Sequence, residues 1–434
     1  MSCNWPNVAL GKYCSKIGSG ATPKGGNSVY LDSGEITLIR SQNIYNEGFK
    51  SDGLVYITPE AAQKLKNVII EPNDVLINIT GDSVARVCLA PKEHLPARVN
   101  QHVAIIRVDP KEFDHRYLRY YLTSLKMQSY LLTIASSGAT RNALTKSMLE
   151  SLEVSKPPLD IQKKIGDVLE QFENKIQLNT QTNQTLEEMA QAIFKSWFVD
   201  FDPVKAKMNG EQPEGMDAVT ASLFPEKLVE SELGLTPEGW NLSEIGDEVT
   251  VVGGGTPSKK NDDFWVDGHI HWTSPKDLSG VQDKVLLDTA SKLTEAGLKK
   301  VSSGLLPVDT VLLSSRAPVG YLALAKVPLA VNQGYIAMKC EKVLPPEFVL
   351  QWCVHRMDEI KQRASGSTFA EISKKNFKPI SVVVPSEEVL IAYKKLVKPL
   401  YDAITSNVRQ SEQLSTLRDT LLPKLLSGAV TISE

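Results

Sequence analysis

A long seam of apolar residues constrains this chain more than any other feature. Between Leu159 and Phe198, apolar residues recur at alternating steps of four and three, at Ile165, Leu169, Phe172, Ile176, Leu186, Ala190, Ile193 and Trp197. This spacing is typical of the a and d positions of a coiled coil, and no proline interrupts it. Asn179 and Asn183 occupy the central seam positions, where a buried Asn lowers stability but specifies register. The segment predicts one long helix with one defined partner.

A second helical run in the same chain supplies that partner. Adding 228 to a position in the first run gives its equivalent in the second, so that Asn179 matches Asn407. When a pseudo-two-fold axis relates two antiparallel helices, their equivalent midpoints meet near the axis. We therefore expect Asn179 and Asn407 to lie close together and to set the register of the helix pair. Pro399 and Arg418 fall inside the second run, so we expect a kink or a frayed seam there.

The duplication extends through the rest of the chain. The segment WPNVALGKYCSKIGSGATPKGG, from Trp5, is echoed from Trp240 by WNLSEIGDEVTVVGGGTPSKK, and similar strands, helices and turns follow in the same order. This predicts an α+β fold with two mixed α/β domains related by an internal repeat and joined by two long antiparallel coiled-coil helices. The expected segments are a first domain at 1–155, a central helix at 156–200, an acidic connector at 201–239, a second domain at 240–383 and a C-terminal helix at 384–434.

Charge is unevenly distributed along the chain. Residues 201–239 hold three Lys or Arg against eight Asp or Glu, and we expect them to form a mostly irregular connector laid over the surface. Without this segment the formal net charge of −3 becomes slightly positive. No region is basic enough to hold nucleic acid tightly by counterion release alone, so a reader of nucleic acid built this way needs a partner that adds affinity.

Composition is that of an ordinary soluble globular protein, with 42% hydrophobic and 23% charged residues. No apolar run reaches membrane-spanning length, and the polar start shows no signal-peptide pattern, so we expect no membrane association. The five cysteines are scattered and lack C-x-x-C spacing. They favour a reducing, cytoplasmic location and argue against both a disulfide framework and a structural zinc site.

The chain lacks the motifs of the common catalytic sites. There is no phosphate-binding loop, H-E-x-x-H pair, nucleophile elbow or Asn-Pro-Pro-Tyr/Phe sequence. The glycines at 253–255 do not match a dinucleotide fingerprint, and His269 and His271 have no third metal ligand nearby. We therefore expect no catalytic residue, no bound cofactor and no metal site.

Two similar domains on an antiparallel helix pair make a pseudo-symmetric molecule with two binding heads. A helix of about 40 residues is about 60 Å long, and major-groove half-sites one turn apart are separated by about 34–36 Å. The helix pair can therefore serve as a ruler between two half-sites. Because the two copies share a framework but differ in loop side chains, the half-sites should differ.

Six segments carry a family resemblance. They are GATP at 20–23 and GGTP at 254–257, SSGATRNALTK at 136–146 and ASGSTFAEISK at 364–374, FWVDGHIHWTSPKDL at 264–278 and FKSWFVDFDPVKAK at 194–207. Because such segments occur twice, in the same order along each repeat, the chain resembles the specificity (S) subunit of type I restriction–modification systems. The resemblance covers nearly all of both repeats.

The resemblance implies a non-catalytic subunit with two target-recognition domains, each reading half of an asymmetric, bipartite double-stranded DNA target in the major groove. The helices would set the gap and dock two methyltransferase (M) subunits, which bind S-adenosylmethionine and methylate adenine. Two restriction (R) subunits would add translocation and cleavage that depend on ATP and Mg²⁺. No cofactor is expected on this chain itself.

Polar and basic residues in loops flanking the strands are the expected DNA contacts, since Arg and Lys suit guanine edges, Gln and Asn suit adenine edges, and Ser and Thr suit phosphates. They are Thr22, Lys24, Arg40, Gln42, Arg141 and Asn142 in the first domain and Thr256, Ser258, Lys259, Ser274, Lys276 and Thr368 in the second. The alternative is that they are solvated loop residues or local turn caps. Phe194, Trp197 and Phe198 are candidates for docking the methyltransferase, or for packing on the first domain or the connector.

Two other functions compete with this interpretation. A single-chain DNA methyltransferase or nuclease with two recognition domains would need a cofactor-binding domain, for which no residues are left. A coiled-coil adaptor that only bridges proteins would explain the seam but not the two elaborate α/β domains.

Overall fold

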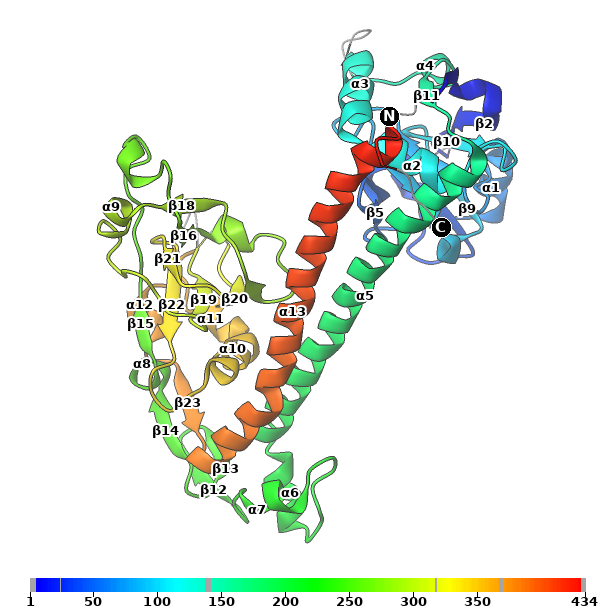
Figure 1. Ribbon diagram of the computed structural model, residues 1–434. Coiled ribbons are helices and arrows are strands. Elements are labelled where there is room, and N and C mark those ends of the chain that lie inside the picture. The colour runs from blue at the N-terminus through cyan, green and yellow to red at the C-terminus, as the bar shows by residue number, and fades with distance from the viewer. Residues whose placement is uncertain (1–4, 24, 137–141, 317, 367–369, 431–434) are drawn as a thin grey trace. The chain divides into compact units, whose positions relative to one another are not determined.

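The computed structural model describes residues 5–23, 25–136, 142–316, 318–366 and 370–430. The chain divides into two compact units, residues 1–176 with 413–434 and residues 177–412. The two longest helices, α5 (Leu159–Phe198) and α13 (Glu387–Leu426), contribute one end to each unit. We call the mixed α/β part of the first unit domain 1 and that of the second unit domain 2 (Figure 1).

Domain 1 is built on two small sheets. An antiparallel sheet has the order β2 (Cys14–Ser19), β10 (Val103–Val108), β7 (Val75–Asn78), β8 (Val87–Leu89). A second sheet has the order β6 (Val55–Ile57), β3 (Ile36–Ile39), β9 (Ala97–Val99), with β3 and β9 parallel. β1 (Asn7–Ala9) pairs with β11 (Glu153–Ser155), and β4 (Ile44–Tyr45) pairs with β5 (Gly48–Phe49). The central strands β7 and β10 are rich in Val and Ile, which suits strands whose two faces are both buried.

Domain 2 repeats the strand order of both main sheets of domain 1. Its larger sheet has the order β15 (Thr250–Val252), β22 (Tyr335–Lys339), β19 (Val311–Ser314), β20 (Leu322–Ala325), with β17 (Val285–Leu286) added at the edge. Its smaller sheet has the order β18 (Ser291–Leu293), β16 (Ile270–Thr273), β21 (Leu329–Val331), again with the last two parallel. β14 (Asn241–Glu244) pairs with β23 (Ser381–Val384). The expected internal repeat is confirmed.

Short helices complete both domains. Domain 1 has α1 (Pro59–Lys64), α2 (His115–Thr123), α3 (Leu125–Ser136) and α4 (Lys146–Glu150). Domain 2 has α8 (Ile245–Glu248), α9 (Glu295–Leu298), α10 (Pro346–His355), α11 (Met357–Gln362) and α12 (Lys374–Phe377). Side-chain caps start several of them: Asp114 accepts hydrogen bonds from the backbone N–H groups of Arg116 and Tyr117 at the first turn of α2.

The two long helices run antiparallel. Within the second unit, Asn179 of α5 contacts Asn407 of α13, and eight residues later Glu187 contacts Tyr401. Rising numbers on one helix meet falling numbers on the other, so the expected orientation is confirmed. Helical structure continues through Pro399, from Glu387 to Leu426, and the expected kink there stays a prediction. The buried side chains of Val397 and Tyr401 flank the proline and keep the seam packed there.

The connector is more ordered than its composition suggests. It contains α6 (Asp202–Met208), α7 (Ala218–Ser222) and a hairpin of β12 (Leu228–Ser231) and β13 (Gly234–Pro237). Val204 and Phe224 are buried in the main apolar core of the second unit. The prediction of a mostly irregular segment is therefore wrong, whereas most of its residues lie at the surface as expected and a few apolar residues anchor it to that core.

Candidate nucleic-acid interface

In domain 2, the GGTP loop is clamped to the end of β21. The backbone N–H of Gly255 donates to the Val331 carbonyl at 3.0 Å, and Thr256 Oγ1 donates to Gln333 Oε1 at 2.6 Å. A Cβ on Gly254 would lie 1.7 Å from the carbonyl oxygen of Val331, so only glycine fits. Loop and strand end form one surface.

Domain 1 builds the same surface with its own residues. Gly20 N–H donates to the Asn100 carbonyl at 3.1 Å, and Thr22 Oγ1 hydrogen-bonds Gln101 Oε1. A Cβ on Gly20 would lie 1.7 Å from the Val99 carbonyl oxygen. Both Thr side chains thus hold a loop against a strand end that is distant in sequence while remaining solvent-exposed, so neither is a local turn cap.

The strand ends at Arg40 and Ser274 are also equivalent. Each residue begins a 3-10 turn, since Arg40 N–H donates to Asn43 Oδ1 at 3.2 Å and Ser274 N–H donates to Asp277 Oδ2 at 2.8 Å. The guanidinium of Arg40 donates to the Gly53 carbonyl at 2.6 Å. This Arg is therefore partly engaged within its own domain.

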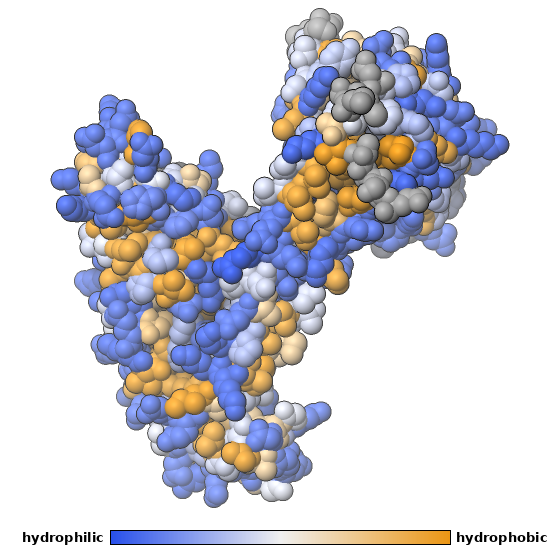
Figure 2. All heavy atoms as spheres, in the orientation of Figure 1, coloured by the Kyte–Doolittle hydropathy of each residue, from blue (hydrophilic) through white to orange (hydrophobic). Residues whose placement is uncertain are grey.

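The other expected contact residues are distributed over the same loops. Gln42 Nε2 reaches the carbonyl of Gly53 at 3.3 Å. Asn142, Ser258, Lys259 and Lys276 are exposed. The face of domain 2 seen in Figure 2 is mostly hydrophilic at the end that carries α9 and β18 (Figure 1). Lys24, Arg141 and Thr368 lie outside the described residues.

Several polar residues of this surface were not predicted from the sequence. A hollow of about 390 Å³ in domain 2 is lined by Ser274, Pro275, Lys276, Ser279, Arg316, Tyr321, Asn332 and Gly334. Gln101 and Gln333, which bind the loop threonines, are likewise new. The signal that points to them is the shared Val-Asn-Gln sequence at 99–101 and 331–333.

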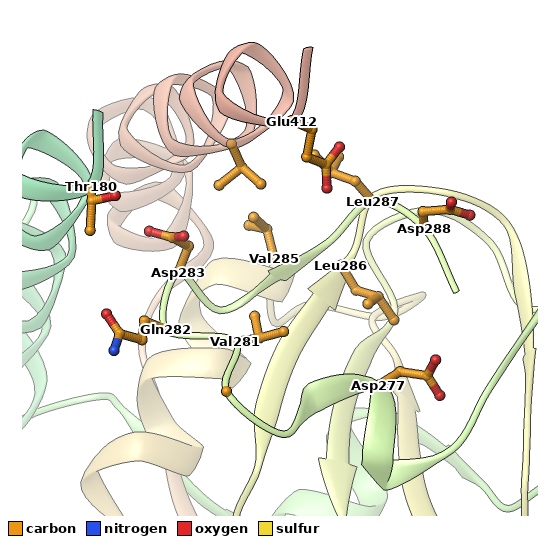
Figure 3. Close-up of a pocket in the computed structure, with 12 residues that line it drawn as sticks. Thr180, Asp277, Val281, Gln282, Asp283, Val285, Leu286, Leu287, Asp288 and Glu412 are labelled. Atoms are coloured by element: carbon orange, nitrogen blue, oxygen red, sulfur yellow. The ribbon is translucent and has the colours of Figure 1, made fainter. Parts of the chain in front are cut away.

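A second hollow in the second unit, of about 380 Å³, is acidic (Figure 3). Asp277, Asp283, Asp288 and Glu412 contribute to its lining. Burial and the Asp288 carboxylate raise the pKa of Glu412. The negative charge of these carboxylates disfavours phosphate groups in the hollow.

The described part of the chain shows no group of three or more His, Cys, Asp or Glu residues arranged to hold a metal ion. The His271 ring faces Asp288, with Nδ1 and Oδ1 3.1 Å apart. The four cysteines that the structure describes are free, and burial raises the pKa of Cys14 and Cys88 to about 12. None of the described helices is long and apolar enough to cross a membrane.

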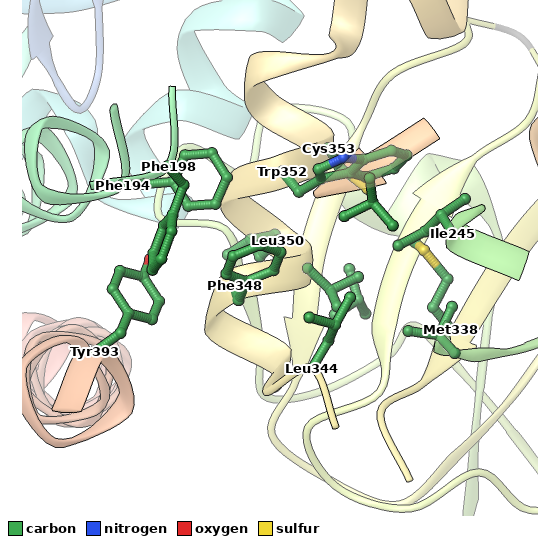
Figure 4. Packing of buried hydrophobic residues seen from close by; sticks show 14 of the residues in the cluster. Phe194, Phe198, Ile245, Met338, Leu344, Phe348, Leu350, Trp352, Cys353 and Tyr393 are labelled. Atoms are coloured by element: carbon green, nitrogen blue, oxygen red, sulfur yellow. The ribbon is translucent and has the colours of Figure 1, made fainter. Parts of the chain in front are cut away.

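The aromatic residues at the end of α5 are internal. Phe194, Trp197 and Phe198 are 3%, 6% and 8% exposed and belong to the main core of the second unit. Figure 4 shows Phe194 and Phe198 within this core. The ring centroid of Phe198 lies 4.9 Å from that of Phe348 in α10, and the centroid of Trp197 lies 5.0 Å from that of Phe224 in the connector. These side chains are therefore unavailable for docking a partner, which corrects that expectation. Trp197 packs on the connector, which is one of the expected alternatives, whereas Phe194 and Phe198 pack on Phe348 of domain 2, which was not expected.

The central Asn residues of the helix pair lie together, as expected. Asn179 Nδ2 donates to the Asn407 carbonyl at 3.3 Å, and Asn407 Nδ2 donates to Asn183 Oδ1 at 2.9 Å. Asn183 Nδ2 also donates to Asp283 Oδ1 at 3.0 Å, so the cluster reaches a loop of domain 2. Their role in setting register stays a prediction.

Comparison with known proteins defines the class. A family model described as "Type I restriction modification DNA specificity domain" matches residues 4–188 and 237–414, which are the two repeats. The chain therefore belongs to the type I restriction–modification DNA specificity family.

Individual relatives have the same description. The chain is 30% identical over 356 residues to the type I restriction enzyme HindI specificity subunit of Haemophilus influenzae, covering 72% of this chain and 77% of that protein. It is 25% identical to the MjaIX specificity subunit of Methanocaldococcus jannaschii, covering 98% of this chain and 93% of that protein. A crystal structure of the type I S subunit from M. genitalium has the same fold, with a TM-score of 0.61, 16% identity and coverage of 97% and 96% of the two chains.

Proposed function

We propose that this chain is the DNA-reading specificity subunit of a type I restriction–modification complex and that it recognises an asymmetric, bipartite target. The observation that carries the proposal is the duplication of a domain whose main sheets have the same strand order and whose loop surface keeps its framework and changes its side chains. Domain 1 would read one half-site and domain 2 the other. Because the surfaces differ, the half-sites should differ.

The chemistry of modification and cleavage belongs to other subunits in this proposal. Two methyltransferase subunits would supply S-adenosylmethionine and the methylating site, and two restriction subunits would use ATP and Mg²⁺. The family match and the names of the relatives support a recognition role. The weak positive charge of the recognition domains supports shared DNA binding, since phosphate contacts supply much of the affinity in such complexes. The complex would work in the cytoplasm, on double-stranded DNA.

Two rivals make different predictions. A single-chain methyltransferase or nuclease would modify or cut DNA without added subunits. A protein adaptor would bind its partners but would not select DNA sequences.

The decisive experiment is co-purification with the cognate methyltransferase subunit, followed by methylation mapping on genomic DNA. We expect a split adenine-methylated motif with two unlike halves and a fixed gap, produced only when both proteins are present. A stable complex that never methylates would favour the adaptor, and methylation by this chain alone would refute the non-catalytic role.

A further inference from the structure

The duplicated fold allows one recognition surface to be compared with the other, position by position. In domain 1, the residue after β7, Ile79, is held from both sides: its N–H donates to the His102 carbonyl at 2.9 Å, and its carbonyl accepts from Leu144 N–H at 2.8 Å. The next residue, Thr80, forms an isolated antiparallel bridge with Ala143. The backbone at Thr80 is therefore rigidly placed.

Domain 2 repeats this arrangement. Ser315, which follows β19, donates to the Gly334 carbonyl at 2.8 Å and accepts from Ile372 N–H at 3.0 Å. The next residue, Arg316, bridges Glu371. Arg316 thus occupies the place of Thr80, and Gly334 the place of His102. Equivalent backbone positions carry chemically different side chains.

The side chains of domain 1 satisfy one another. Thr80 Oγ1 lies 2.5 Å from His102 Nδ1, and Gln101 Nε2 lies 2.8 Å from His102 Nε2. Gln101 Oε1 in turn accepts the hydrogen bond from Thr22. The result is a hydrogen-bonded chain of side chains that spans the loop surface.

At the place of the Thr80–His102 pair, domain 2 has the guanidinium of Arg316 beside a hollow. Gly334 has no side chain to fill the space that corresponds to the imidazole, and Arg316 lines the resulting hollow of about 390 Å³ with Lys276 and Asn332. The side chain of Arg316 is 37% exposed, and its Nη1 lies 3.7 Å from Glu371 Oε2. This distance is too long for a hydrogen bond. The carboxylate therefore orients the guanidinium without occupying its fork of N–H donors.

We propose that Arg316 is a base-reading residue of domain 2 and that it recognises guanine in the half-site read by this domain. The inference rests on the proposed function and names a specificity-determining contact within it. Arg donates two parallel hydrogen bonds to guanine O6 and N7 in the major groove, and this is the commonest specific contact between proteins and DNA. A guanidinium on a fixed backbone with an orienting carboxylate suits that geometry. Thr80 and His102 occupy the same place in domain 1 and present no guanidinium, so the two half-sites are read differently.

The test compares Arg316→Ala and Arg316→Lys with the wild-type chain, each co-expressed with the methyltransferase subunit. Lys keeps the charge but lacks the planar fork of donors. Methylated motifs are mapped on genomic DNA, and binding is measured by competition with duplexes that differ at one base pair. Arg356→Ala is the control, since this Arg of similar exposure donates to the Ser381 carbonyl and lines no part of the hollow.

We expect both Arg316 variants to lose roughly 5- to 150-fold of discrimination at one guanine position of one half-site, with the other half-site unchanged. The Arg356→Ala control should keep the wild-type motif. If Arg316→Ala weakens binding to all sequences equally and Lys restores it, the contact is to phosphate and the proposal is wrong. An unchanged motif in both variants also refutes it. A wild-type complex that yields no split motif would instead refute the proposed function.

Discussion

A buried carboxylate fastens the helix pair to domain 2 within the second unit. Glu187 of α5 is 8% exposed, and its two oxygens accept hydrogen bonds from Tyr401 of α13 at 2.8 Å, Gln351 of α10 at 3.0 Å and Gln191 at 2.9 Å. Lys284, from the loop before β17, lies 3.0 Å away as its counter-ion. Four structural elements therefore meet at one side chain.

We expect Glu187→Ala to destabilise the second unit by about 3 kcal/mol. Removing one partner of a buried ion pair typically costs roughly 3–5 kcal/mol, because the remaining charge stays desolvated. The Lys284 side chain is 23% exposed, which places the cost at the lower end. The buried hydroxyl of Tyr401 would also lose its acceptor, and the buried amide of Gln351 would keep only that hydroxyl as an acceptor. For a unit of this size, about 3 kcal/mol corresponds to a fall in melting temperature of roughly 6–12 °C.

Thermal unfolding followed by tryptophan fluorescence measures this change directly, because five of the six tryptophans, all but Trp5, lie within residues 177–412. Glu188→Ala is a matched control: its carboxylate is exposed and accepts a hydrogen bond from Gln184 one turn earlier on the same helix. That variant should stay within about 0.5 kcal/mol of the wild type. Equal melting temperatures for the Glu187 and Glu188 variants would refute the network as a source of stability.

Three further predictions follow from the same structure. Burial raises the pKa of Glu187, but Lys284 and the hydrogen bonds lower it by more, so the pKa lies below the ordinary 4.5. The stabilisation by this carboxylate is therefore present above pH 4.5 and is lost as pH falls through the folded-state pKa. The difference in melting temperature between wild type and Glu187→Gln should shrink below pH 4.5. The double variant Asn179→Leu, Asn407→Leu should raise the melting temperature, because apolar side chains then complete the seam. The rise should be limited, because the buried amide oxygen of Asn183 loses its donor, Asn407 Nδ2. The variant should also broaden the range of gap lengths among methylated motifs, and an unchanged single gap would contradict the register role. Gly20→Ala should destabilise domain 1 by about 3 kcal/mol, because its Cβ would overlap a backbone oxygen. Gly18→Ala has open space around it and should be neutral or stabilising by up to about 1 kcal/mol. Urea unfolding followed by circular dichroism measures both changes.

The sequence by itself determined the architecture. The seam spacing and its repetition predict two long helices, and the doubled strand order predicts two similar domains. The juxtaposition of Asn179 and Asn407 follows from symmetry alone, because equivalent points of two related antiparallel helices meet near the axis. These features are periodic or repeated, so they can be read along one chain.

Tertiary structure decided which polar and aromatic side chains are available. Phe198 is an aromatic residue of the kind found in docking patches, but it is buried against α10. The acidic connector is anchored to the same core by Phe224. Arg316 is one cation among many in the sequence, and it stands out only because Gly334 and Glu371 are brought beside it from distant parts of the chain. Burial and orientation depend on contacts between residues far apart in sequence. Periodicity reports the face of a helix or strand, but only the folded chain shows what covers that face.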